Sequence, residues 1–200
     1  QISNLQLPSS GVGGRLRQAY TDAHKLGIST SAESNAIGGG NCVRISAAGV
    51  LTQGTNRLGS APGTSPFCLV LSPDGNYVFR GDVAQQSIIW PASGTLADGA
   101  PDYPLGQRWT LTAIDEPIHR ARWSPDSRIL YALSREGRVY VLRFTNGQFV
   151  VVSEISEIGE TPVQVALAPD NRTVAVSYDN GPRIATRIYN RVGDSFVLVQ

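Results

Sequence analysis

The sequence predicts an all-β protein built from about four copies of a four-stranded antiparallel unit. Glycine accounts for 21 of the 200 residues, and short alternating apolar runs lie between the turns. Pro-Asp followed by a small residue occurs three times between two such runs, which is a hairpin signature. These turns recur at a nearly constant spacing, so the chain is a repeat protein.

The first two strands of each unit form a hairpin around an aspartate. The clear copies run from Cys68 to Phe79, from Ala121 to Ala132 and from Val165 to Val176, and a weaker copy without proline runs from Arg17 to Ile28. Proline favours the first central position of a type I turn, and Asp caps such turns with its own carboxylate. We therefore expect a structural role, and not metal binding, for Asp22, Asp74, Asp126 and Asp170.

The second half of each unit also repeats. The expected third strands are Cys42–Ile45, Ser87–Trp90, Arg138–Leu142 and Arg183–Ile188, and the expected fourth strands are Val50–Thr52, Trp109–Thr112, Phe149–Val152 and Phe196–Val199. The turn aspartates are 52, 52 and 44 residues apart, a period typical of β-propeller blades. The expected blades span about 15–52, 66–112, 117–153 and 162–200, after a lead-in over 1–14 in which Gln1–Leu7 is a candidate strand.

Several of these residues resemble those of the WD-repeat and lactonase-like (YVTN-type) β-propeller families. The similar segments are Ser72–Gly75 between the first two strands, Ser87–Trp90 as a third strand, and Gly63–Pro66 and Gly159–Pro162 before first strands. The resemblance runs from about Arg15 to the end. Because most relatives have six to eight blades, it implies a propeller that further blades or a partner complete. No unit has the Gly-His and Trp-Asp pair of WD repeats.

Composition excludes some classes of function. The net charge is +1, so no nucleic-acid partner is indicated. No apolar run approaches the length of a membrane span, and no signal peptide is visible. The chain begins at Gln1 and has no Met, which suggests processing or a longer parent. Cys42 and Cys68 are the only cysteines, and they indicate neither a compartment nor a disulfide framework.

Candidate catalytic residues are few. His119 lies near Asp115, Glu116 and Arg120 at the start of the third unit, where a propeller has its mouth, and a histidine near carboxylates can carry out acid–base chemistry. Glu116 and His119 are therefore the catalytic candidates, although the sequence places no nucleophile. Two histidines cannot form a three-histidine metal site, and no cofactor or metal is expected.

Candidate binding residues lie on long loops and on one strand. The segments 53–65 and 91–107 read as long loops, which often carry function on the rim of a repeat array. Strand alternation places Arg120 and Arg122 on one face. The binding candidates are Arg57, Asp102, Tyr103, Arg120 and Arg122.

Two functions remain open at this level. The first is a non-catalytic interaction or scaffolding module, for instance in a large assembly such as a viral particle, with protein partners or further copies covering its open sheet edges. The alternative is a lactonase-like propeller hydrolase or isomerase, which would need carboxylates and histidines converging on the central channel.

Overall fold

The structure, a computed structural model, describes residues 17–21, 26–30, 40–45, 51–58, 66–82, 87–94, 107–157 and 159–199. Within these ranges, side chains are described from residue 68 onward except at positions 69 and 82. The described residues form four four-stranded sheets and contain no α-helix. The predicted all-β fold is confirmed.

The first sheet consists of β1 (Arg17–Thr21), β2 (Leu26–Thr30), β3 (Gly40–Ile45) and β4 (Leu51–Leu58). The second sheet consists of β5 (Pro66–Leu71), β6 (Tyr77–Asp82), β7 (Ile88–Pro91) and β8 (Trp109–Thr110). The third sheet consists of β9 (Ile118–Trp123), β10 (Ile129–Ser134), β11 (Arg138–Thr145) and β12 (Gln148–Ser156). The fourth sheet consists of β13 (Thr161–Leu167), β14 (Thr173–Asp179), β15 (Ile184–Val192) and β16 (Ser195–Leu198).

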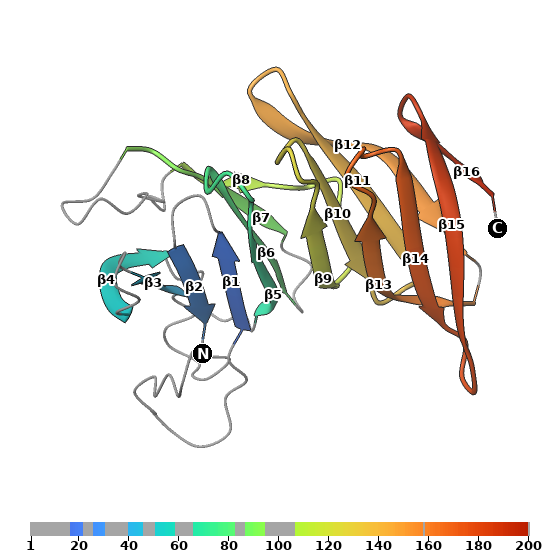
Figure 1. The fold of residues 1–200 in the computed structure, drawn as a ribbon, viewed down its shortest axis with the longest axis horizontal. Coiled ribbons are helices and arrows are strands. Elements are labelled where there is room, and N and C mark those ends of the chain that lie inside the picture. Colours follow the sequence, from blue (N-terminus) through green and yellow to red (C-terminus); the bar gives the residue numbers. More distant parts are fainter. Residues whose placement is uncertain are drawn as a thin grey trace.

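Every sheet is antiparallel, with its strands in chain order. The four sheets follow one another side by side from the N-terminus to the C-terminus (Figure 1). Their first strands β1, β5, β9 and β13 are in contact in that order. These four strands therefore form the shared inner wall from which the sheets extend.

The Pro-Asp turns have one geometry in the second, third and fourth sheets. In each, the N–H two residues after proline donates to the carbonyl of the residue before proline, and these bonds join Gly75 to Ser72, Ser127 to Ser124 and Asn171 to Ala168 at 2.9, 2.9 and 3.0 Å. The donors have φ values of 75°, 60° and 57°, in the left-handed region that glycine and asparagine tolerate best. This is a type I turn followed by a left-handed residue, a common hairpin connection.

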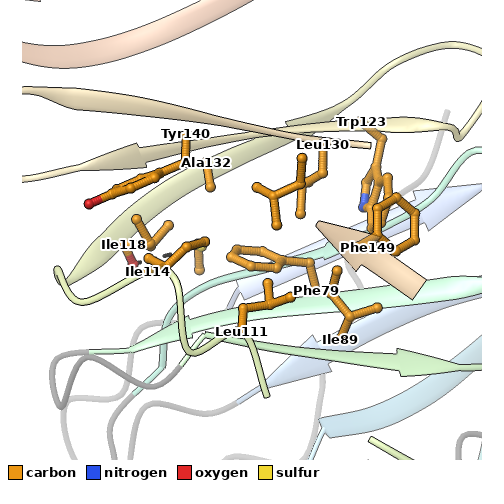
Figure 2. Close-up of a cluster of buried hydrophobic side chains, with 12 residues drawn as sticks. Phe79, Ile89, Leu111, Ile114, Ile118, Trp123, Leu130, Ala132, Tyr140 and Phe149 are labelled. Atoms are coloured by element: carbon orange, nitrogen blue, oxygen red, sulfur yellow. Dashed lines mark hydrogen bonds between the residues drawn. The ribbon is translucent and has the colours of Figure 1, made fainter. Parts of the chain in front are cut away.

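The second and third sheets share one apolar core. In Figure 2, Phe79, Ile89 and Leu111 lie opposite Leu130 and Ala132 of β10, and each is at most 7% exposed. Fully burying a side chain of this size contributes about 1.5–3 kcal/mol. The packing of these two sheets is therefore a main source of stability.

The opposite face of β10 packs on the fourth sheet. Ile129, Tyr131 and Leu133 alternate with Leu130 and Ala132 along the strand, and all five are at most 4% exposed. Their neighbours across the interface include Val174, Val176 and Tyr178 of β14. Because both faces of β10 are covered, the strand reads as a continuous apolar run.

The backbone of β6 approaches the third sheet closely at Gly81. A Cβ atom built at Gly81 would lie 2.7 Å from both the Cβ atom and the carbonyl oxygen of Ile118. Only glycine leaves room for this approach. Arg80, the preceding residue, is buried, with 3% of its surface exposed.

Several element boundaries differ from those expected. The predicted loop 53–65 is wrong over residues 53–58, because β4 continues to Leu58 and pairs with β3 beyond a register shift between Asn41 and Val43. The residues of this part of β4 are mainly polar, and the hydrogen bonds to β3 keep them in the sheet. Local hydrophobicity does not reveal such pairing.

Two boundaries in the second sheet also differ. Pro91 ends β7 opposite Tyr77 instead of opening the loop, and β8 ends at Thr110. The candidate strand 1–7 lies outside the described residues.

The described part of the chain has no helix long and apolar enough to cross a membrane. Cys68 is buried and its Sγ donates to the carbonyl of Ile118 at 3.9 Å, while the side chain of Cys42 lies outside the described residues.

Candidate functional site

A groove of about 460 Å³ runs across the inner wall, within the size range of small-molecule sites. It crosses three successive first strands, since Val70 and Leu71 come from β5, Arg120 to Trp123 from β9, and Gln164 and Val165 from β13. Leu133 of β10 and Pro73 of the first turn complete it. Among the residues that the structure describes, no acidic side chain lines this groove.

Two arginines give the groove its charge. Arg120 lies opposite Leu133 and Arg122 opposite Tyr131, so both project from the face of β9 that looks toward the fourth sheet, as strand alternation predicts. Both side chains are exposed. Within the described part of the chain, neither guanidinium has an ion pair or a side-chain hydrogen bond. Two uncompensated cations on a groove wall favour an anionic ligand.

The rest of the groove is mainly apolar. Trp123 is 5% exposed, and its indole Nε1 donates to the carbonyl of Val70 at 3.2 Å, which fixes the ring against β5. Gln164 is exposed and supplies an amide. The sequence analysis did not predict Gln164. When the Pro-Asp turns are aligned, Gln164 occupies in the fourth sheet the position that Arg120 occupies in the third.

The inner strands of the second, third and fourth sheets share a β-bulge near their start. The register of β5, β9 and β13 shifts at their second or third residues, so Phe67, His119 and Val163 are each unpaired in the ladder. A bulge re-aims a side chain without changing the rest of the register. The repeat therefore offers a position at which the side chain varies while the backbone stays constant.

His119 occupies this bulge in the third sheet. It is half-buried, and its Nδ1 atom is buried without a geometrically acceptable hydrogen bond. Desolvation, together with the charges of Arg120 and Arg135, lowers the pKa of His119 to about 4, although the backbone of Pro162 and Leu133 opposes this. The imidazole is neutral at pH 7. His119 is not among the residues that line the groove, and its ring lies near the backbone of Pro162 in the fourth sheet.

Glu116 belongs to a separate polar cluster. Its Oε1 lies 2.9 Å from Nε of Arg138, and Arg138 also donates to the Tyr140 hydroxyl at 3.3 Å. That hydroxyl donates to Asp115 at 3.3 Å. Glu116 is 4% exposed and does not line the groove. Neither Glu116 nor His119 is among the groove residues, although the charge of Arg120 acts on His119.

A similar cluster in the fourth sheet was not predicted. Arg187 pairs with Glu160 and lies 3.6 Å from Glu157, while Tyr189 donates to Glu157 at 2.7 Å. The hydrogen bond from Arg187 holds the pKa of Glu160 below its usual range. The shared signal is an Arg-x-Tyr pattern in the third strand, with carboxylates before the first strand of the same sheet. Arg187 lies opposite Val176 and Tyr140 opposite Ala132, so the two copies differ by two positions in register.

The turn aspartates accept local hydrogen bonds. Asp74 accepts from the Ser72 hydroxyl at 2.5 Å and from the N–H of Asn76 at 3.0 Å. Asp126 accepts from Ser124 at 2.6 Å, and Asp170 accepts from the N–H of Arg172 at 2.9 Å. The described residues contain no group of three or more His, Cys, Asp or Glu side chains that could hold a metal.

The other candidates lie away from the groove or outside the described residues. Arg57 lies in β4, with its backbone opposite Asn41, and nothing is described of its side chain. Asp22, Asp102 and Tyr103 fall outside the described residues.

No family model and no curated protein matches the chain. Solved structures do match. A protein assigned as a 6-phosphogluconolactonase from Bacteroides uniformis is 14% identical, with a TM-score of 0.67 over 93% of this chain and 53% of that chain. The periplasmic gluconolactonase of Pseudomonas aeruginosa is 17% identical, with a TM-score of 0.67 over 94% of this chain and 53% of that chain. The β-propeller domain of Myceliophteria thermophila Cps50 (Swd1) is 12% identical, with a TM-score of 0.61 over 92% and 71%.

These likenesses, together with the four radiating sheets, define the class of the protein: its fold is that of β-propeller blades. Each described sheet is one blade, and the inner wall is the side that faces the propeller channel. The chain spans about half the length of the lactonase structures that it matches.

Proposed function

We propose that this chain is part of a lactonase-like β-propeller whose channel-facing groove binds an anionic, hydroxyl-bearing small molecule. A phosphorylated sugar lactone, or the acid formed when its ring opens, has this chemistry. The observation that carries the proposal is the pair Arg120 and Arg122 on the wall of a groove whose described lining includes no carboxylate. The names of the similar structures, a 6-phosphogluconolactonase and a gluconolactonase, support it.

In this proposal, the arginines of the groove bind the anionic end of the ligand, and the apolar and amide side chains contact its sugar part. Guanidinium groups bind phosphate or carboxylate oxygens with short, charge-assisted hydrogen bonds. The apolar wall at Leu71 and Trp123 suits the carbon face of a sugar, and Gln164 can both donate to and accept from hydroxyls. Selectivity for a charged ligand follows because an uncharged sugar leaves both arginines unpaired.

Lactone hydrolysis adds water to the ring carbonyl and breaks the ring C–O bond, which gives a hydroxy acid. Among the groove residues, the arginines can hold the anionic end and stabilise the carboxylate of the product. None of the described residues that line the groove is a general base. The groove therefore accounts for binding and orientation, and the group that activates water is sought elsewhere in the propeller.

The direct test is calorimetric titration of the protein with 6-phosphogluconate, the open-ring acid. We expect saturable binding that Arg122→Gln weakens about tenfold or more, because a hydrogen bond to a charged group contributes roughly 1.5–3 kcal/mol. Arg183→Gln is the matched control, since Arg183 is exposed on the fourth sheet and does not line the groove. Gluconate, which lacks the phosphate, should bind more weakly.

Absence of binding by the wild-type protein, or an equal loss in Arg122→Gln and Arg183→Gln, would contradict this function.

A non-catalytic interaction module is the second candidate. The observation that favours it is an exposed, almost uncharged face on the fourth sheet, where Ile184, Val192 and Val197 are 71, 64 and 54% exposed. Exposed apolar surface of this kind is typical of protein contacts.

A further inference from the structure

The groove has two unlike ends, because the three inner strands that line it are equivalent residue by residue. In β5, β9 and β13 the bulge residue lies the same number of positions before the turn aspartate. Gln164 of β13 is therefore equivalent to Arg120, and Leu71 of β5 is equivalent to Trp123. The groove runs along β9 from a polar end at Arg120 and Gln164 to an apolar end at Leu71 and Trp123.

The charge of the groove is confined to β9. Neither β5 nor β13 contains an Asp, Glu, Lys or Arg residue, and the residues equivalent to Arg122 are Val70 and Ala166. Both cations of the groove therefore lie on one strand, with uncharged strands on either side. An anionic ligand meets its two charged partners one after the other along β9.

The spacing of the two arginines suits two separate anionic groups. Arg120 and Arg122 are separated by one residue of an extended strand, so their Cα atoms lie roughly 6.5–7 Å apart. Both side chains are exposed, and no described carboxylate pairs with either of them. To bind a single anion, the two guanidinium groups would have to converge against their mutual repulsion. Two anionic groups of one ligand satisfy both cations without that convergence.

The end of the groove at Arg120 is the more positive. The charges of Arg120 and Arg135 both lower the pKa of His119, so two cations lie around the same ring at this end. Gln164 adds an amide that can donate to an anion's oxygens. Arg122 instead lies next to Trp123, which is buried. A phosphate monoester, with a charge of roughly −1.5 to −2 at pH 7, suits the first position, and a singly charged carboxylate suits the second.

We propose, on the basis of the function proposed above, that the groove binds two anionic groups of one ligand: a phosphate at Arg120 and Gln164, and a carboxylate at Arg122. A phosphorylated sugar lactone has the phosphate but no carboxylate, because its carboxyl carbon is part of the ring ester. Hydrolysis adds water at that carbon, breaks its bond to the ring oxygen and creates the carboxylate. The groove therefore retains the open-ring acid more tightly than the lactone, and the acid competes with the lactone as it accumulates.

The test is calorimetric titration with three ligands at about pH 8, where a phosphate monoester is doubly charged. The ligand 6-phosphogluconate carries both anionic groups, glucitol 6-phosphate only the phosphate, and gluconate only the carboxylate. We expect the wild type to bind 6-phosphogluconate about tenfold or more tighter than either of the others. Arg122→Gln should abolish the advantage over glucitol 6-phosphate, and Arg120→Gln the advantage over gluconate. Arg183→Gln, outside the groove lining, is the control and should keep both.

The comparison of ligands on the wild-type protein needs no variant, and circular dichroism checks that each variant keeps its sheet content. Equal affinity of the wild type for 6-phosphogluconate and glucitol 6-phosphate overturns the proposal, because the carboxylate then has no partner. So does an equal loss for both phosphorylated ligands in Arg122→Gln, since both arginines then hold one phosphate. Either result leaves the function proposed above standing, whereas a wild-type protein that binds none of the three ligands overturns both.

Discussion

At the scale of single residues, the bulge of the inner strands keeps the same backbone pairing although its side chain differs from sheet to sheet. Phe67, His119 and Val163 share the bulge, yet they differ in size and polarity. The bulge does not depend on a histidine, because the fourth sheet forms it with valine. The polar ring of His119 is instead an energetic cost, since its Nδ1 atom is buried without a partner.

His119 should make stability depend on pH. Its pKa is about 4 in the folded protein and about 6.5 when unfolded, so the unfolded chain binds more protons between these values. The stability that depends on neutral His119 should therefore be fully present above pH 6.5, and the free energy of unfolding should fall as the pH is lowered toward 4.

We expect His119→Val, which copies the fourth sheet, to reduce this dependence. Urea unfolding of both proteins at pH 7 and pH 5 measures it. Glu160, whose lowered pKa matters only below its usual value of 4.5, contributes little in this range. An identical change with pH in the two proteins would show that His119 is not desolvated.

At the scale of elements, the hairpins differ by one hydroxyl. The Ser72 hydroxyl donates to Asp74 and accepts from the N–H of Tyr77 at 2.9 Å, and Ser124 makes the equivalent bonds in the third sheet. Ala168 replaces this serine in the fourth sheet, where Asp170 keeps its bond to Arg172. The serine links the turn to the start of the second strand, and the fourth sheet lacks this link.

Ala168→Ser should stabilise the protein by about 0.5–1.5 kcal/mol, because it adds hydrogen bonds to a turn of the same geometry. Ser124→Ala should destabilise it by about 1–3 kcal/mol, since the buried N–H of Ile129 loses its acceptor. Thermal unfolding measures both changes. If Ala168→Ser is destabilising, the third and fourth hairpins are not equivalent.

At the scale of the whole molecule, stability depends on whether a face is covered by a neighbouring sheet. Val139 and Thr186 occupy the same register position in the third and fourth sheets and have nearly the same shape. Val139 is fully buried, whereas Thr186 is exposed. A comparison of these two positions therefore isolates the effect of the covering sheet.

Val139→Thr should cost about 1–3 kcal/mol, because it buries a hydroxyl between two sheets without a partner. Thr186→Val should change stability by no more than about 0.5 kcal/mol. Chemical denaturation measures both changes. Equal effects at the two positions would mean that the third and fourth sheets do not pack as described.

The sequence by itself determined the local structure of the repeat. Pro-Asp with a small residue predicted the three described turns, because these residues have strong intrinsic preferences for them. Alternation also placed Arg120 and Arg122 on one face of one strand. The long reach of β4 was missed, since a polar strand is held by its ladder and not by a local signal.

Only the tertiary structure decided which sequence-distant residues meet. The groove joins Arg122 to Gln164 and Leu71 from two other sheets, and no spacing in the chain encodes that contact. His119, in the bulge of β9, is not among the residues that line the groove, and Glu116 pairs with Arg138 in a separate cluster. Turns depend on neighbours in the chain, whereas a site depends on how rigid sheets stack, and that is settled by packing across their faces.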